Sequence, residues 1–191
     1  MSIKVLVIGL DGATFKVIDP LVRKGYLPNL ARLMKEGSSG ELRSTIPPVS
    51  GPAWSAFKTG KSPGQTGVYD FMSFDHQKYQ TSLMQLTNIQ DPRLWDIVKL
   101  YSDFRVGIYN LPTTYPPSRV NGFMISGFPL PEGADNYIYP TDLKEDLDTI
   151  TGGHTTDIRY RDYKCDDDLL KALSDIIDQR VKVYHYLKDK F

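Results

Sequence analysis

The chain has 191 residues, enough for one sizeable domain, with 23 Lys and Arg balanced by 23 Asp and Glu. A net charge of zero without a local basic cluster gives no face for binding nucleic acid. The single cysteine, Cys165, excludes an internal disulfide framework and a cysteine-rich zinc site. No apolar run resembles a signal peptide or approaches the ~20 residues of a membrane span, so we expect a soluble, cytoplasmic protein.

The first part of the chain alternates candidate strands and helices. Residues 3–10 form a continuous β-branched and aliphatic run, which is typical of a strand buried on both faces of a parallel sheet. Turn residues and prolines separate the segments that follow. The other elements expected here are helices over residues 14–24, 28–36 and 52–59 and a strand over residues 40–45.

The rest of the chain continues this alternation. The expected elements are helices over residues 91–101, 140–150 and 166–190 and strands over residues 104–110, 121–126 and 154–160. In the last helix, apolar residues recur at helical spacing from Leu169 to Leu187. Strands that alternate with helices predict the α/β class, and we expect residues 1–191 to form a single α/β domain.

An acidic residue ends the first apolar run, in the stretch VLVIGLDGATF (residues 5–15). A dinucleotide-binding loop needs the pattern G-x-G-x-x-G, which the spacing of Gly9 and Gly12 does not give. A haloacid-dehalogenase-like phosphatase needs a nucleophilic aspartate where this chain has Gly9. Two interpretations of Asp11 remain: a metal-binding carboxylate at the C-terminal edge of a sheet, or a turn residue.

A second candidate lies in the proline-rich loop IPPVSGP (residues 46–52). Ser50 precedes an expected helix, and the N–H groups at a helix N-terminus attract anions. A hydroxyl held beside them could attack a phosphorus or sulfur centre if a metal ion lowered its pKa, and Asp11 is the natural ligand for such an ion. The structural alternative is that Ser50 caps the helix.

Longer motifs favour the chemical interpretation of both residues. They are VIGLDGATF, LPNLARLMKEGSSGELRSTIPPVSGPAWSAFKTGKSPGQTGVYDF, LWDIVK and VGIYNLPTTYPPSRVNGFMISGF, which span residues 7–128 in this order. These motifs resemble the N-terminal part of the alkaline phosphatase superfamily. Within it, they are most similar to the type I phosphodiesterase and nucleotide pyrophosphatase group, especially predicted prokaryotic phosphohydrolases or phosphomutases. The resemblance implies a three-layer αβα sandwich with a mostly parallel sheet.

The resemblance also implies roles for two residues. Asp11 corresponds to a ligand of one of two divalent metal ions, with zinc or manganese expected. Ser50 corresponds to the nucleophile, which contacts that metal and forms a covalent phospho-enzyme. The function implied is that of a hydrolase, a metal-dependent phosphohydrolase or phosphodiesterase that acts on a phosphate-ester small molecule and engages neither nucleic acid nor a membrane.

The chain departs from the family pattern in two ways. Ala53 stands where nucleotide pyrophosphatases carry an asparagine, which argues against that specificity. The family's C-terminal metal motifs, resembling T-D-x-x-x-H and D-H-G, do not occur. We therefore expect an N-terminal fragment that carries half the site, holds at most one partial metal site, is inactive alone and self-associates through the face of the missing half. The alternative is a catalytically incomplete fragment or a non-catalytic nucleotide- or protein-interaction module of the same fold.

Other residues near these motifs are expected to be structural. His76, His154 and His185 lack the paired spacing of zinc ligands, so we expect packing or surface roles for them. Lys58 and Lys61 lie close to Ser50 in sequence and could attract phosphate, but we expect both to be solvated.

Overall fold

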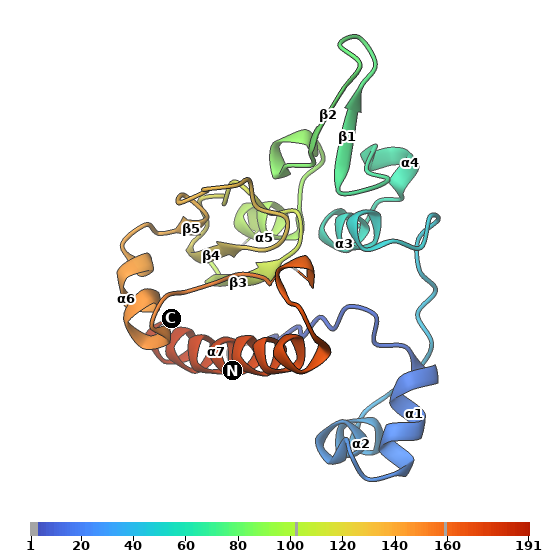
Figure 1. The fold of residues 1–191 in the computed structure, drawn as a ribbon. Helices are drawn as coiled ribbons and strands as arrows, with labels where there is room; N and C mark the ends of the chain where they lie inside the picture. The colour runs from blue at the N-terminus through green and yellow to red at the C-terminus, as the bar shows by residue number, and fades with distance from the viewer. Residues whose placement is uncertain (1–3, 102, 159) are drawn as a thin grey trace. The chain divides into compact units, whose positions relative to one another are not determined.

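The computed structural model describes residues 4–101, 103–158 and 160–191. The chain divides into two compact units, Met1–Ser44 and Thr45–Phe191. Figure 1 shows the elements of each unit in chain order. The prediction of one domain over residues 1–191 stays a prediction, and each unit is described here by itself.

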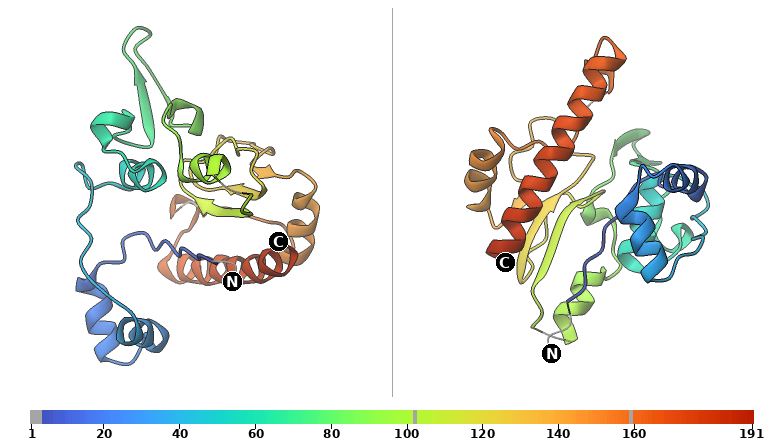
Figure 2. Two further views of the ribbon diagram at one scale, coloured as in Figure 1. Left: turned by 180° about the vertical axis from the view of Figure 1, so that it is seen from behind. Right: turned by 90° about the horizontal axis from the view of Figure 1, so that it is seen from below.

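The first unit holds an extended segment and a helix pair. Helices α1 (Phe15–Arg23) and α2 (Pro28–Glu36) confirm the two helices predicted here, and they lie side by side in Figures 1 and 2. The strands predicted over residues 3–10 and 40–45 do not form among the described residues. The apolar side chains of residues 5–8 are 60–81% exposed. A β-branched run becomes a strand only when its backbone pairs with a neighbour, and no such ladder forms here.

The second unit is built around a small mixed sheet. Its strands are β3 (Val106–Leu111), β4 (Gly122–Ser126) and β5 (Ile138–Tyr139), in the order β3-β4-β5. The β3 and β4 strands pair in parallel and β4 and β5 antiparallel. This confirms the two strands predicted over residues 104–110 and 121–126, whereas the two-residue β5 has no pattern long enough to detect.

Side chains alternate between the two faces of this sheet. The pair Ile108 and Met124 joins a buried cluster with Trp95 of α5 (Leu94–Tyr101). On the other face, Ile125 packs with side chains of α6 (Leu143–Thr151) and α7 (Asp166–Lys190). Figure 2 shows α7 extending along this side of the unit. Each fully buried apolar side chain of this kind contributes about 1.5–3 kcal/mol relative to exposure.

Residues 72–83, for which the sequence predicted neither helix nor strand, form a β-hairpin. Strands β1 (Met72–Asp75) and β2 (Gln80–Leu83) pair antiparallel and project from the unit in Figure 1. The helix α3 (Ser50–Thr59), the short helix α4 (Pro63–Thr66) and the 3₁₀ turn η1 (Leu86–Asn88) flank it. Both strands have only four residues, which is too short for the alternation of side chains to be recognised in the sequence.

The C-terminal part follows the helical periodicity closely. The helix predicted over residues 166–190 is confirmed as α7, and those predicted over residues 91–101 and 140–150 are confirmed with later starts. The strand predicted over residues 154–160 is wrong for its described part, where Tyr160 begins a 3₁₀ turn, η2 (Tyr160–Asp162). Arg159 lies outside the described residues.

Together these elements confirm the α/β class. Among the described residues, β3 and β4 are the only parallel pair. No helix in the described part of the chain combines the length and apolar character needed to cross a membrane.

Candidate functional site

Ser50 is the first residue of α3 and is half-buried. The sequence placed it in a loop before a helix headed by Pro52, but the helix begins two residues earlier, with Val49 as its N-cap. Pro52 is tolerated within the first turn because its missing N–H would have no partner inside the helix. The intrahelical ladder starts where Ala53 N donates to Val49 O at 3.1 Å. Ser50 is therefore held at the positive end of the helix dipole and is not the capping residue.

The backbone after Ser50 is packed tightly against another segment. A Cβ atom on Gly51 would lie 2.9 Å from the carbonyl carbon of Asp70 and 3.1 Å from the amide nitrogen of Phe71. Only a residue without a side chain permits this approach. It holds the first turn of α3 beside the end of the GVYDF motif, where the exposed Asp70 side chain accepts a hydrogen bond from Phe71 N at 2.5 Å. The sequence motif included Asp70 but gave no sign of this proximity.

At the other end of α3, Lys58 is 1% exposed, so the expectation that it is solvated is wrong. Its Nζ donates to Pro112 O at 3.1 Å, to Thr113 O at 2.9 Å and to Thr113 Oγ1. Three acceptors match the three donors of an ammonium group, which is why this cation can be buried. Burial, with a smaller effect of the charge on Arg93, lowers the pKa of Lys58 to about 7.

Lys61 behaves as expected for a partly solvated lysine. Its ammonium group pairs with the carboxylate of Asp91, and 42% of the Lys61 side chain is exposed. Two lysines three residues apart therefore have different environments, because the helix ends at Gly60 and only Lys58 points into the unit.

The end of β3 and the chain just beyond it have an unusual backbone. Asn110 and Thr113 have φ angles of 54° and 55°, in the left-handed region that residues other than glycine rarely adopt. Thr113 and Thr114 are fully buried, and Thr114 Oγ1 donates to Leu111 O at 2.6 Å. Strained residues at the C-terminal end of a parallel strand are typical of functional sites in α/β proteins. The sequence pattern did not indicate this conformation, since side-chain identity does not reveal a left-handed φ at a threonine.

Asp11 lies in the first unit, in the turn between residues 4–10 and α1. Gly12, with φ 68°, lets the chain reverse, and Thr14 caps α1 by accepting a hydrogen bond from Lys16 N at 3.3 Å. The Asp11 side chain is exposed. Its role as a metal ligand therefore still depends on the family resemblance.

The three histidines occupy different environments. His76 is exposed in the turn of the β1–β2 hairpin, and His185 is exposed on α7. His154 stacks on Tyr137 with ring centroids 5.9 Å apart, and its Nδ1 lies 3.2 Å from the Tyr137 hydroxyl. Burial lowers the pKa of His154 to about 4, with the charge of Asp148 opposing the shift and that of Arg180 adding to it. All three keep the packing or surface roles expected for them.

The described residues do not by themselves form a metal centre. In the described ranges, no three His, Cys, Asp or Glu side chains come together as a metal-binding group. Asp11 and Ser50 supply one carboxylate and one hydroxyl, and they lie in different units. Zinc takes about four ligands and hard cations such as Ca²⁺ about six to eight, so this pair alone does not fit a metal ion.

Comparison with known proteins assigns the amino-acid sequence to a family. The family model for type I phosphodiesterase / nucleotide pyrophosphatase matches residues 5–185, a segment that contains both Asp11 and Ser50. Searches of curated proteins and of solved structures each gave no match. The family match extends beyond the sequence motifs, which end at residue 128, to include α6 and most of α7.

Proposed function

Because the chain belongs to the type I phosphodiesterase / nucleotide pyrophosphatase family, within the alkaline phosphatase superfamily, we propose that it contributes the nucleophile for cleavage of a phosphate ester. Membership of this family suggests phosphoester hydrolysis. The observation that carries the proposal is the position of Ser50 within the matched segment, at the N-terminus of a ten-residue helix. Its substrate would be a small phosphate ester.

The proposed chemistry is a double displacement at phosphorus. The Oγ atom of Ser50 attacks the phosphorus atom, the bond from phosphorus to the leaving alcohol oxygen breaks, and that alcohol departs with a proton. Water then attacks the phosphorus of the phosphoserine, which regenerates the serine hydroxyl and releases phosphate from a monoester substrate or a phosphate monoester from a diester. The dipole of α3 favours the negative charge that develops beside its first turn. Transfer to a second alcohol in place of water would give phosphomutase chemistry.

The family is generally metal-dependent, and we propose two divalent ions, zinc or manganese, for the complete enzyme. Asp11 is the proposed ligand from this chain, with Ser50 contacting the same ion. Asp11 and Ser50 together offer two kinds of oxygen ligand, a carboxylate and a hydroxyl, which amounts to at most one partial metal site. We further propose that the complete fold is a three-layer αβα sandwich with a mostly parallel sheet, and that the protein acts in the cytoplasm without nucleic-acid or membrane partners.

Turnover of bis(p-nitrophenyl) phosphate and p-nitrophenyl phosphate with Mn²⁺ or Zn²⁺ tests the proposal, which requires turnover by this chain and so departs from the expectation that it is inactive alone. Ser50→Ala should abolish turnover, whereas Ser38→Ala, at an exposed serine of the first unit, should leave it unchanged. Measurable turnover that is equal in wild type and Ser50→Ala would contradict the role of Ser50.

One observation favours a second candidate, a chain that is catalytically incomplete or non-catalytic. It is the lack of a three-residue metal-binding group among the described residues. Absence of turnover with every added metal would support this candidate, whereas tight stoichiometric metal binding by the chain would oppose it.

A further inference from the structure

Helix α7 carries a second apolar face in addition to the one that packs in the core. Ile176, Val183 and Leu187 are buried against the rest of the unit. A separate set of large apolar side chains stays 40–62% exposed along the helix. These residues, called the α7 stripe below, are Leu170, Leu173, Ile177, Val181 and Tyr184.

The α7 stripe is narrow and straight. At about 100° per residue, its five members lie within about 40° of the direction of Ile177 and extend along about 21 Å of the helix. A continuous apolar strip of this kind on a helix surface is an interaction site, because each exposed side chain forgoes the free energy of burial.

The spacing along the stripe is the same in both directions from Ile177. Leu173 and Val181 lie four residues before and after Ile177, and Leu170 and Tyr184 lie seven residues before and after it. A palindromic surface is self-complementary under a two-fold rotation, which brings residue i opposite j and j opposite i.

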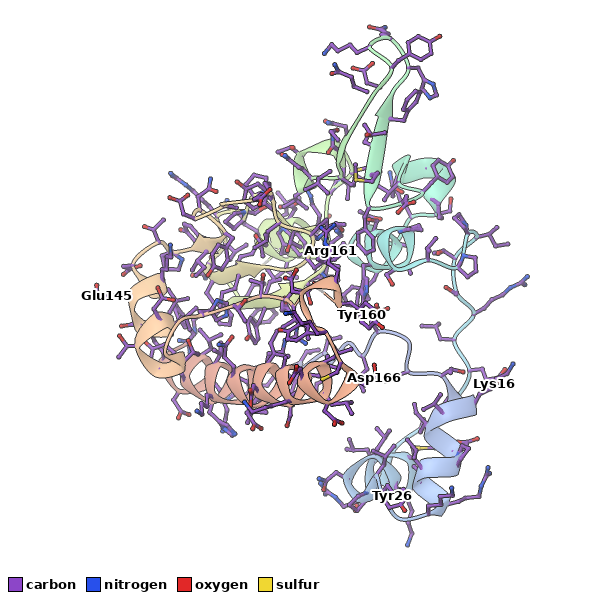
Figure 3. All side chains as sticks on the ribbon, in the orientation of Figure 1. Lys16, Tyr26, Glu145, Tyr160, Arg161 and Asp166 are labelled. Carbon is purple, nitrogen blue, oxygen red and sulfur yellow. The ribbon has the colours of Figure 1, made fainter. Side chains whose placement is uncertain are left out.

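Charge extends the same pattern beyond the apolar residues. Asp166 and Lys188 lie eleven residues before and after Ile177, within about 20° of its direction on the helix. Both side chains are exposed, and Figure 3 labels Asp166 at the start of α7. The acidic side chains of α7 lie before Ile177 or directly beside it, with Asp189 as the exception. Its basic side chains lie after Ile177, with Lys171 as the exception.

We propose that a second copy of this chain covers the α7 stripe, with the two α7 helices antiparallel about a two-fold axis at Ile177. Ile177 then packs on Ile177 of the second copy, Leu170 on Tyr184 and Leu173 on Val181. Asp166 of each copy faces Lys188 of the other at both ends of the contact. This proposal does not depend on the role of Ser50.

Charge selects the antiparallel arrangement over the parallel one. Parallel helices would bring Asp166 beside Asp166 and Lys188 beside Lys188. Exposed ion pairs add little net binding free energy, so they set the orientation while the apolar stripe supplies most of the binding free energy. Five side chains per copy bury less than the roughly 800 Å² per partner of a standard interface, so we expect a dissociation constant in the micromolar range.

Sedimentation equilibrium of the whole chain tests the proposal. The wild type should dimerise reversibly at micromolar concentration. Ile177→Asp places two carboxylates on the axis and should yield a monomer with unchanged helix content by circular dichroism, since the side chain is already 56% exposed. A wild type that stays monomeric up to millimolar concentration, or an Ile177→Asp variant that dimerises as well as wild type, would overturn the proposal.

A charge exchange tests the orientation. Asp166→Lys and Lys188→Asp should each weaken dimerisation several-fold, and the double variant should recover most of the loss because the pairs form again with reversed sign. Lys182→Asp makes the same charge change as Lys188→Asp about 140° away from the direction of Ile177 and should have little effect. A double variant weaker than either single one would rule out the antiparallel register.

Discussion

The Nζ atom of Lys58 lies 2.9 Å from the carbonyl oxygen of Thr113, which joins the last turn of α3 to the chain that leaves β3. The same nitrogen reaches Pro112 O at 3.1 Å. This contact fixes the helix that carries Ser50 relative to the sheet. It also buries a cation for which the described residues give no acidic partner within ion-pair distance.

Replacing Lys58 by Met should remove a pH dependence of stability above neutral pH. The folded-state pKa of about 7 lies below the usual lysine pKa of 10.5, so the unfolded chain binds more protons between these values. The free energy of unfolding should therefore rise with pH across this window, by about 1 kcal/mol per pH unit from this group. Denaturant titrations at pH 7 to 10 measure the slope.

Lys61→Met is the matched control, because Lys61 is partly exposed and paired with Asp91. Its slope should equal that of wild type. If Lys58→Met also kept the wild-type slope, Lys58 would be solvated in solution and its buried contacts with Thr113 would be wrong.

His154 should make the protein sensitive to acid. Its folded-state pKa of about 4 lies below the usual 6.5, so protonation favours the unfolded chain as pH falls between these values. The stability lost over this window should be smaller in His154→Gln than in wild type. Thermal or chemical unfolding from pH 7 to 4 gives the difference. His76→Gln, at an exposed histidine, should follow the wild-type curve, and identical curves for all three proteins would contradict burial of His154.

Gly51→Ala should destabilise the second unit by about 1–3 kcal/mol, because the new methyl group would meet the backbone of Asp70 and Phe71 at 2.9–3.1 Å. Backbone atoms cannot move aside as a flexible side chain can. Gly64→Ala makes the same change where the nearest atoms are 3.9 and 4.0 Å away and should be nearly neutral. Urea unfolding of both variants measures the contrast, and equal stabilities would show that the α3 turn does not approach Asp70 this closely.

Sequence periodicity predicted the long helix, whose hydrogen bonds are local, and two of the buried strands. The helix α7 has 25 residues with apolar side chains at helical spacing and acids in its first turn, so its bounds could be predicted. Strands β3 and β4 are short buried runs with clear turn residues around them. Residues 4–10 have an equally strong pattern but form no ladder, because strand formation depends on a partner that the pattern does not specify.

The surroundings of the candidate site were harder to predict. Ser50 was identified by its motif, yet the burial of Lys58 depends on acceptors at Pro112 and Thr113, more than fifty residues away. Residue type favours an exposed lysine, and only the tertiary fold overrides that preference. The proximity of Gly51 to Asp70 is likewise a property of packing between segments.

The central claim is that Ser50 attacks phosphorus, and trapping the covalent intermediate tests it most directly. The chain is incubated with p-nitrophenyl phosphate and Mn²⁺ or Zn²⁺, quenched in acid, digested and analysed by mass spectrometry. We predict one added phosphoryl group on the peptide that contains Ser50, and none in Ser50→Ala. Turnover with an unmodified Ser50 peptide, or a phosphoryl group on another residue, would contradict the claim.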